Sequence, residues 1–144
     1  ISVLSNSTFI HRPKIHEALS KVDNNILKLD TINAEYIIKV DRPTQPSYDV
    51  NRIIADIKSF NGQAIIQTMF MKGTTEDGYD VDNTTEAFVA PWLETIKEIA
   101  PREVMIYTID RETPDQHLQK ATHEELDAIR DRVIALGIPC TASY

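Results

Sequence analysis

Polar side chains stand where four short apolar segments of this sequence give way to loops. These residues are Ser5 and Asn6; Lys28 and Asp30; Gln67 and Thr68, which the apolar Met69 and Met71 follow; and Tyr107, Thr108 and Arg111. In parallel α/β proteins, ligands bind beyond the carboxyl ends of the strands, because the loops and helix N-termini there present hydrogen-bond donors. If the four segments are such strands, these residues form one binding edge.

Lys28 and Gln67 place a charge and an amide inside otherwise apolar segments. Burying either group costs several kcal/mol unless it is paired or faces a ligand. For any one residue an ordinary strand-to-loop transition explains the pattern, with Lys28 extended to solvent or paired with Asp30. Four polar ends together favour a binding site.

Common catalytic and metal motifs are absent or incomplete. The sequence has no glycine-rich phosphate loop, and the run HEELD at 123–127 matches the zinc motif HExxH only in part. Asp77, Asp80 and Asp82 suggest a calcium loop, but the sixth position counted from Asp80 is Thr85 where an EF-hand needs glycine. A solvated acidic loop explains these carboxylates better.

Hydrophobic periodicity predicts strands that alternate with helices along a single domain, 1–144. The expected strands are 1–4, 26–30, 64–70 and 103–109, and the expected helices are 13–22, 50–60, 88–99 and 123–136. Helical crossovers require parallel strands and right-handed connections. Pro91 is expected to kink or restart the third helix, and Thr122 with Glu125 to form a capping box for the last. These four βα units form either an open sheet or an arc of a barrel.

Charge and composition exclude several classes of protein. The net charge of −7 comes from 15 basic and 22 acidic residues, and the basic ones never cluster, which disfavours nucleic-acid binding. No apolar run approaches the roughly 20 residues of a membrane span, and no signal peptide opens the sequence. The single cysteine, Cys140, excludes an internal disulfide and predicts a reducing, cytoplasmic setting.

A family resemblance rests on short runs taken in order. They are VLSNS at 3–7, KLD at 28–30, RP at 42–43, TMFMKG at 68–73 and VMIY at 104–107, with Arg111 and Pro114 after them. In this order the chain resembles the second half of radical S-adenosylmethionine (radical SAM) iron–sulfur oxidoreductases, and it is similar to the activating enzymes of glycyl-radical proteins. The resemblance implies the C-terminal arc of a partial (βα)6, TIM-like barrel.

The resemblance also implies cofactors and site residues. In the family a [4Fe–4S] cluster reductively cleaves S-adenosylmethionine (SAM) to a 5′-deoxyadenosyl radical. By this likeness Ser5 and Asn6 would lie beside the ribose and methionine of SAM, with Ser7 in place of the usual glycine. Lys28 and Asp30 would hold the ribose or the methionyl carboxylate. The residues bordering the adenine would be Thr68, Met69 and Met71, and those facing the substrate would be Tyr107, Thr108 and Arg111.

One departure from the family pattern concerns the cluster. The family holds it with a Cys-x3-Cys-x2-Cys triad, and this chain has one cysteine and lacks the glycine-rich motif that binds the methionyl amine. Together with a strand that begins at Ile1 without a methionine, this predicts a C-terminal fragment that binds no cofactor and is inactive alone. Such a fragment would self-associate through its cut strand edge, and its parent would act on a small molecule or a protein. The alternative is a stand-alone, doubly wound α/β binding module without a cofactor.

Overall fold

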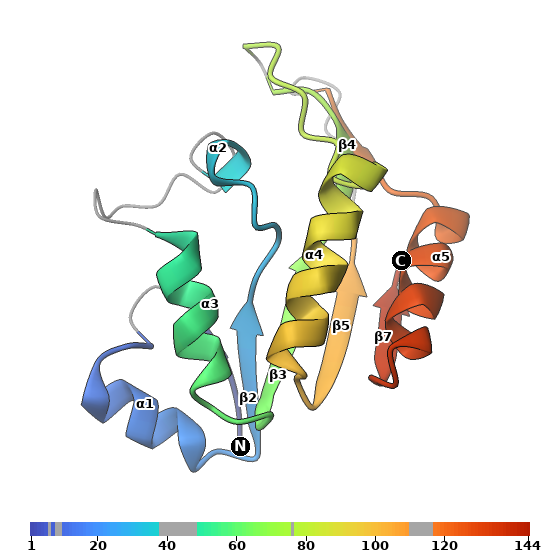
Figure 1. Ribbon diagram of the computed structural model, residues 1–144. Coiled ribbons are helices and arrows are strands. Elements are labelled where there is room, and N and C mark those ends of the chain that lie inside the picture. The colour runs from blue at the N-terminus through green and yellow to red at the C-terminus, as the bar shows by residue number, and fades with distance from the viewer. Residues whose placement is uncertain (6, 8–9, 38–48, 76, 110–116) are drawn as a thin grey trace.

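Five parallel strands form the main sheet of the computed structural model, which describes residues 1–5, 7, 10–37, 49–75, 77–109 and 117–144 (Figure 1). The strands are β1 (Ser2–Ser5), β2 (Asn24–Lys28), β3 (Ala64–Met69), β5 (Glu103–Tyr107) and β7 (Cys140–Ser143). Their order in the sheet is β1-β2-β3-β5-β7, so each pairs in parallel with the next of these five strands along the chain. The predicted parallel α/β sheet is confirmed, and β7 is a strand that the periodicity missed.

Four helices connect these strands and lie on one face of the sheet (Figure 1). They are α1 (Pro13–Ser20), α3 (Val50–Lys58), α4 (Glu86–Ile99) and α5 (His123–Ala135), and the short α2 (Ala34–Tyr36) follows β2. A doubly wound sheet reverses its strand order and carries helices on both faces. The doubly wound alternative is therefore wrong for the described part of the chain, which forms an arc of a βα barrel.

The main core lies between the sheet and these helices. Alternate residues of the strands, such as Leu27, Ile66 and Val104, are fully buried there. Trp92 of α4 packs edge-on against Phe70 and donates a hydrogen bond of 3.1 Å from its indole nitrogen to Thr68 Oγ1. Because strand residues alternate between the two faces, the residues between these core positions point away from the helices.

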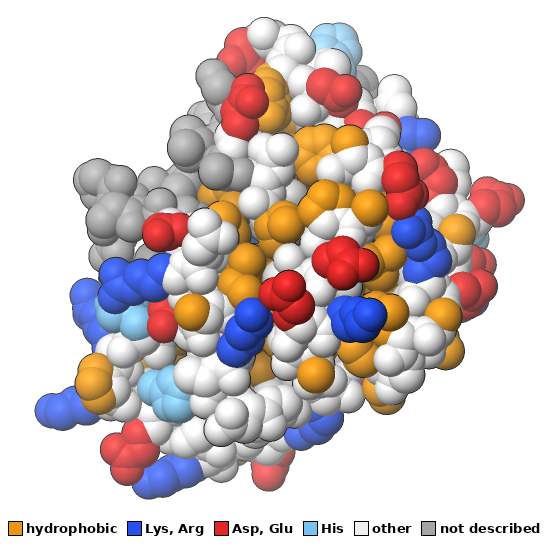
Figure 2. All heavy atoms as spheres, in the orientation of Figure 1, with side chains coloured by type: hydrophobic (Ala, Val, Ile, Leu, Met, Phe, Trp, Pro, Cys, Tyr) orange, Lys and Arg blue, Asp and Glu red, His pale blue; other side chains and the backbone are white. Residues whose placement is uncertain are grey.

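The helix ends follow the sequence signals. Thr122 Oγ1 accepts from the Glu125 amide at 3.1 Å, and Glu125 Oε1 accepts from the Thr122 amide at 3.0 Å, which confirms the predicted capping box of α5. The α4 helix runs from Glu86 to Ile99 with Pro91 inside it, two residues longer at its start than predicted, and without a restart. Figure 2 shows the helix-bearing face, where acidic and basic side chains are interspersed rather than gathered by sign.

A second, two-stranded sheet lies beyond the carboxyl ends of the main strands. It pairs β4 (Met71–Gly73) with β6 (Leu118–Lys120) in antiparallel fashion, where the sequence predicted only loops. A smaller apolar cluster packs against one face of this small sheet. It consists of the buried Tyr36, Met71 and Val81 and of partly buried apolar neighbours. The hydroxyl of Tyr36 donates to the carbonyl of Val81 at 2.8 Å.

Gly73 is the position on which this small sheet depends. Its φ is +99°, and a Cβ there would meet the carbonyl oxygen of His117 at 2.0 Å. We expect Gly73→Ala to lower the free energy of unfolding by more than about 2 kcal/mol, since it adds a backbone clash to the strain of a positive φ. Urea denaturation measures the difference.

Gly78→Ala is the matched control, because Gly78 has a φ of +83° with no atom within 4 Å of a new Cβ. It should cost only the strain of about 1 kcal/mol. Equal losses in the two variants would contradict the close approach of β4 and β6.

Candidate functional site

The face of the sheet opposite the helices carries a row of half-buried side chains that runs across the C-terminal halves of three strands. Lys28 lies opposite Gln67 in the β2–β3 register, and Gln67 lies opposite Met105 in the β3–β5 register. Met69 and Tyr107 form the next pair along the same strands. All five are half-buried. The structure therefore brings together two residues, Lys28 and Gln67, that the sequence marked separately as out of place.

Asp30 lies next to this row and is buried, with 3% of its side chain exposed. Its Oδ2 lies 3.5 Å from Lys28 Nζ, and its Oδ1 accepts a hydrogen bond of 2.9 Å from the Met69 amide. Burial raises the pKa of the Asp30 carboxyl, while the Lys28 ammonium and the Met69 amide act in the opposite direction. The Lys28–Asp30 pairing that the sequence left open is thus formed, and 37% of the Lys28 side chain remains exposed.

Asn83 also fixes the end of β3 through hydrogen bonds to its backbone. Sequence reasoning did not select this residue. Its Oδ1 accepts from the Met71 amide and its Nδ2 donates to the Met69 carbonyl, both at 2.9 Å. Phe70 donates its amide to the Tyr107 carbonyl at 2.8 Å. The backbone between Met69 and Met71 is consequently fixed at every amide. An asparagine in a polar loop gives no sequence signal for such a role.

The turn after β1 is formed with serine in a left-handed conformation. Ser7 has a φ of +70° and is fully buried. Its amide donates to Ser5 Oγ at 3.1 Å and its own hydroxyl donates to the Lys28 carbonyl at 3.0 Å. These bonds let serine occupy a conformation that favours glycine. Asn6, predicted beside it, lies outside the described residues.

Several other predicted site residues have structural contacts. Thr68 Oγ1 donates to the Leu29 carbonyl at 2.6 Å on the helix-facing side, and Met71 is buried in the smaller cluster. Thr108 is buried and accepts a hydrogen bond of 2.9 Å from the Ala121 amide, which fixes the end of β6 against the end of β5. Arg111 lies outside the described residues. Met69 and Tyr107 are the members of this predicted set that lie on the helix-free face.

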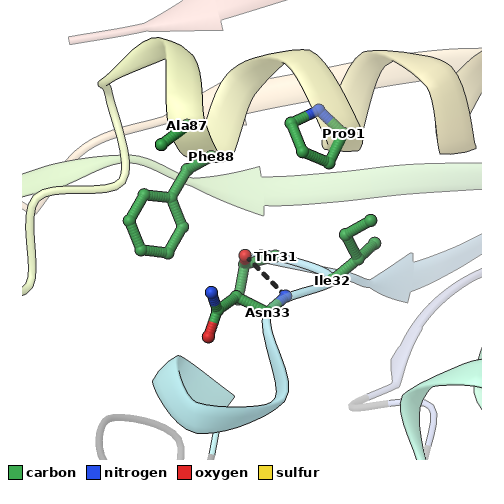
Figure 3. Close-up of a pocket in the computed structure, with 6 residues that line it drawn as sticks. All are labelled: Thr31, Ile32, Asn33, Ala87, Phe88 and Pro91. Carbon is green, nitrogen blue, oxygen red and sulfur yellow. Dashed lines mark hydrogen bonds between the residues drawn. The ribbon is translucent and has the colours of Figure 1, made fainter.

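A shallow pocket of about 210 Å³ opens between the loop after β2 and the first turns of α4 (Figure 3). Its lining comprises Thr31, Ile32, Asn33, Ala87, Phe88 and Pro91. Thr31 is buried, and its Oγ1 accepts from the Asn33 amide at 3.1 Å. Pro91 has no N–H to donate to the Ala87 carbonyl, so this helix carbonyl at the pocket wall has no α-helical donor. The pocket can hold a small, largely apolar group.

The described residues do not provide the ligands of an iron–sulfur cluster. No group of three or more His, Cys, Asp or Glu side chains with metal-binding geometry occurs among them. Cys140, the only cysteine of the sequence, is buried in the core, and burial raises the pKa of its thiol to about 12. A cluster needs several thiolates, so it does not fit this chain. Within the described ranges, no helix has the length and apolar character of a membrane span.

Comparisons of sequence give two curated relatives and no matching family model. The chain is 30% identical to the UPF0026 protein of Helicobacter pylori strain J99 and 29% identical to that of strain 26695, each over 113 residues. The alignment covers 76% of this chain and 33% of each relative. The chain therefore spans about a third of the length of these curated relatives.

Comparisons of structure give two crystal structures with the same fold. A domain of pyruvate-formate lyase-activating enzyme from Bacteroides vulgatus superposes with a TM-score of 0.70 at 11% identity, over 100% of this chain and 82% of that one. A radical SAM methyltransferase from Sphaerobacter thermophilus superposes with a TM-score of 0.71 at 16% identity, over 100% of this chain and 40% of that one. The fold is thus the one found in radical SAM enzyme domains, as the sequence resemblance implied.

The burial of Asp30 predicts a pH dependence of stability. Because the pKa of Asp30 is raised above its ordinary value of 3.8, the folded chain holds this proton more tightly than the unfolded chain. The contribution of Asp30 to the free energy of unfolding therefore falls as the pH rises above 3.8. Asp30→Asn cannot titrate, so its stability relative to the parent should improve over the same range in urea denaturations at several pH values.

Glu86→Gln is the control of opposite sign. A hydrogen bond from Arg132 lowers the pKa of Glu86 below 4.5, so the folded state favours its charged form. The stability of Glu86→Gln relative to the parent should therefore decline as the pH rises toward 4.5. A flat or declining difference for Asp30→Asn would contradict the burial effect.

Proposed function

We propose that this chain is the C-terminal half of a radical SAM barrel, where it flanks SAM and faces the substrate. The observation that carries the proposal is the helix-free face of the sheet. It gathers Lys28, Gln67, Met69 and Tyr107 at the carboxyl ends of strands whose order and one-sided helices are those of a barrel arc. Superposition of the whole chain on two radical SAM enzyme domains supports the same assignment.

The chemistry of this face suits SAM, which carries a carboxylate, a ribose diol and an apolar adenine. The half-exposed Lys28 ammonium and the neighbouring Gln67 amide can donate to a carboxylate or a hydroxyl. Asp30 would orient Lys28, and Met69 offers an apolar contact on the same face. In radical SAM enzymes the bound cofactors supply a 5′-deoxyadenosyl radical. The role of this half is to bind and orient SAM and substrate.

The cluster in this proposal is held by a part of the protein outside this chain. This chain has one cysteine and no described metal-binding group, while its curated relatives are about three times as long as the segment it matches. We therefore place it as the SAM-flanking portion of a longer oxidoreductase, with either a small-molecule or a protein substrate. A protein substrate would be in line with an activating enzyme of the kind that one structural neighbour represents.

The edge of the sheet at β1 fits the same interpretation. In the described part of the chain β1 pairs only with β2, and Leu4 is 59% exposed on the helix-free face. A further parallel strand of the longer protein would cover this edge. The isolated chain would pair there with a second copy, because an unpaired edge templates strand addition.

The test uses the longer protein that contains this chain, reconstituted with iron and sulfide under anaerobic conditions. We expect reductant-dependent formation of 5′-deoxyadenosine from SAM. Lys28→Gln should weaken SAM binding about tenfold or more in equilibrium dialysis, because it removes a charged donor from the helix-free face. The half-exposed Lys58 pairs with Glu98 between α3 and α4 on the opposite face, so Lys58→Gln should leave the Kd unchanged.

The proposal fails if the reconstituted protein yields no 5′-deoxyadenosine. It also fails in its assignment of the site if Lys28→Gln binds SAM as tightly as the parent. A change at both positions alike would point to a general effect of charge rather than to a contact.

A further inference from the structure

Lys120, in the small sheet, is a charged residue that the sequence gave no reason to select. It lies directly opposite Met71 in the antiparallel β4–β6 pair, and opposite residues of such a pair share a face. Met71 and Leu118 mark that face as the one packed on the smaller apolar cluster. Lys120 is half-buried on this face, as expected of a lysine whose aliphatic stem packs on an apolar surface while its ammonium stays in solvent.

The position of Lys120 is fixed from both sides at the carboxyl edge of the main sheet. The next residue, Ala121, donates its amide to Thr108 Oγ1 at 2.9 Å, directly after β5. On the other side, Met71 follows the clamped end of β3 and its amide donates to Asn83. Lys120 is therefore placed over the ends of β3 and β5, the strands that present Gln67, Met69 and Tyr107.

The other lysines of this edge each have a carboxylate partner, which sets Lys120 apart. Lys28 pairs with buried Asp30 at 3.5 Å. Lys72 points to the opposite face of the small sheet, where it lies 3.4 Å from Glu125. Among the described residues, no carboxylate forms an ion pair with Lys120. A half-buried ammonium without such a partner favours an anionic group of the ligand as its counterion.

We infer that Lys120 is a specificity-determining residue that binds an anionic group, a carboxylate or a phosphate, of the molecule bound at the carboxyl edge. This inference rests on the proposed function for the location of the site. The anionic group belongs either to the methionyl part of SAM or to the substrate. Lys120 would bind the anionic group in the same way in both cases, and the choice of probe distinguishes SAM from the substrate.

The experiment labels the lysines of the longer protein that contains this chain by reductive ¹³C-methylation, which keeps their charge. NMR follows the dimethyl signals of Lys120 and Lys97, each assigned as the signal that its Lys→Gln variant lacks. The probes are malonate, inorganic phosphate, SAM and methylthioadenosine, which lacks the methionyl carboxylate. We expect the Lys120 signal to shift with a saturable Kd for an anionic probe. Lys97 is exposed on α4 and forms no ion pair among the described residues, so its signal reports non-specific binding and should stay in place.

Lys120→Gln should weaken the binding of that probe about tenfold or more, and Lys97→Gln should leave it unchanged. A Lys120 shift with SAM but not with methylthioadenosine assigns the methionyl carboxylate. A shift with malonate or phosphate alone assigns an acidic group of the substrate. The inference is overturned if no probe shifts Lys120 beyond Lys97, or if Lys120→Gln binds as tightly as the parent.

The same titration keeps this inference apart from the proposed function. A saturable Lys120 shift with malonate or phosphate supports the anion site even if the reconstituted longer protein forms no 5′-deoxyadenosine. Conversely, formation of 5′-deoxyadenosine with a Lys120 signal that no probe moves would retain the proposed function and reject the anion site.

Discussion

The pairing of each strand of the main sheet with the next main-sheet strand along the chain is the constraint on which the rest of this structure depends. Parallel neighbours need a crossover, and crossovers of one hand place every connecting helix on the same side of the sheet. Four helices consequently cover one face, while the other face keeps the half-buried row that includes Lys28, Gln67 and Tyr107. A reversal of strand order at any point would have covered this row with a helix.

The buried carboxylate of Asp30 fixes the carboxyl ends of β2 and β3 beside that row. Asp30 joins β2 to β3 through the Met69 amide and keeps the Lys28 ammonium near the helix-free face. Burying a charge is costly unless it is paired and hydrogen-bonded, and Asp30 has both kinds of partner. Asn83 adds two neutral hydrogen bonds at the same place, to the Met69 carbonyl and from the Met71 amide. Such rigidity is what a site at a sheet edge needs in order to orient a ligand.

The structural comparisons establish the fold of this chain, while its side chains indicate what the site could bind. The likeness to two radical SAM enzyme domains, at 11% and 16% identity, establishes the fold. The helix-free face adds the polar groups that SAM would require, and the lone, core-packed Cys140 excludes a cluster held by this chain. The functional unit in our proposal is therefore larger than the 144 residues, and this half contributes binding and orientation.

The sequence by itself determined the features that depend on neighbours along the chain. The periodicity of 50–60 predicted α3, the Thr122–Glu125 pair predicted the start of α5, and the alternation of elements predicted a parallel sheet. It also marked Lys28, Asp30 and Gln67, because a polar residue in an apolar strand is conspicuous without knowledge of its partners. Neighbouring residues of a strand point to opposite faces, so Thr68 and Met69 had to lie on different sides of the sheet. The structure shows which side each takes: Thr68 lies under Trp92 and Met69 on the helix-free face.

Tertiary structure alone decided the features that join distant segments. Three contacts link residues a dozen or more positions apart. They are the β4–β6 strand pair, the hydrogen bond from the Met71 amide to Asn83, and the hydrogen bond from the Ala121 amide to Thr108. Three-residue strands are too short to give a periodic signal, and the amide of one asparagine is like that of any other until its partner is known. For the same reason Lys120 could be selected only after β6 was placed against β4, since the sequence does not specify which face of a short strand will be covered.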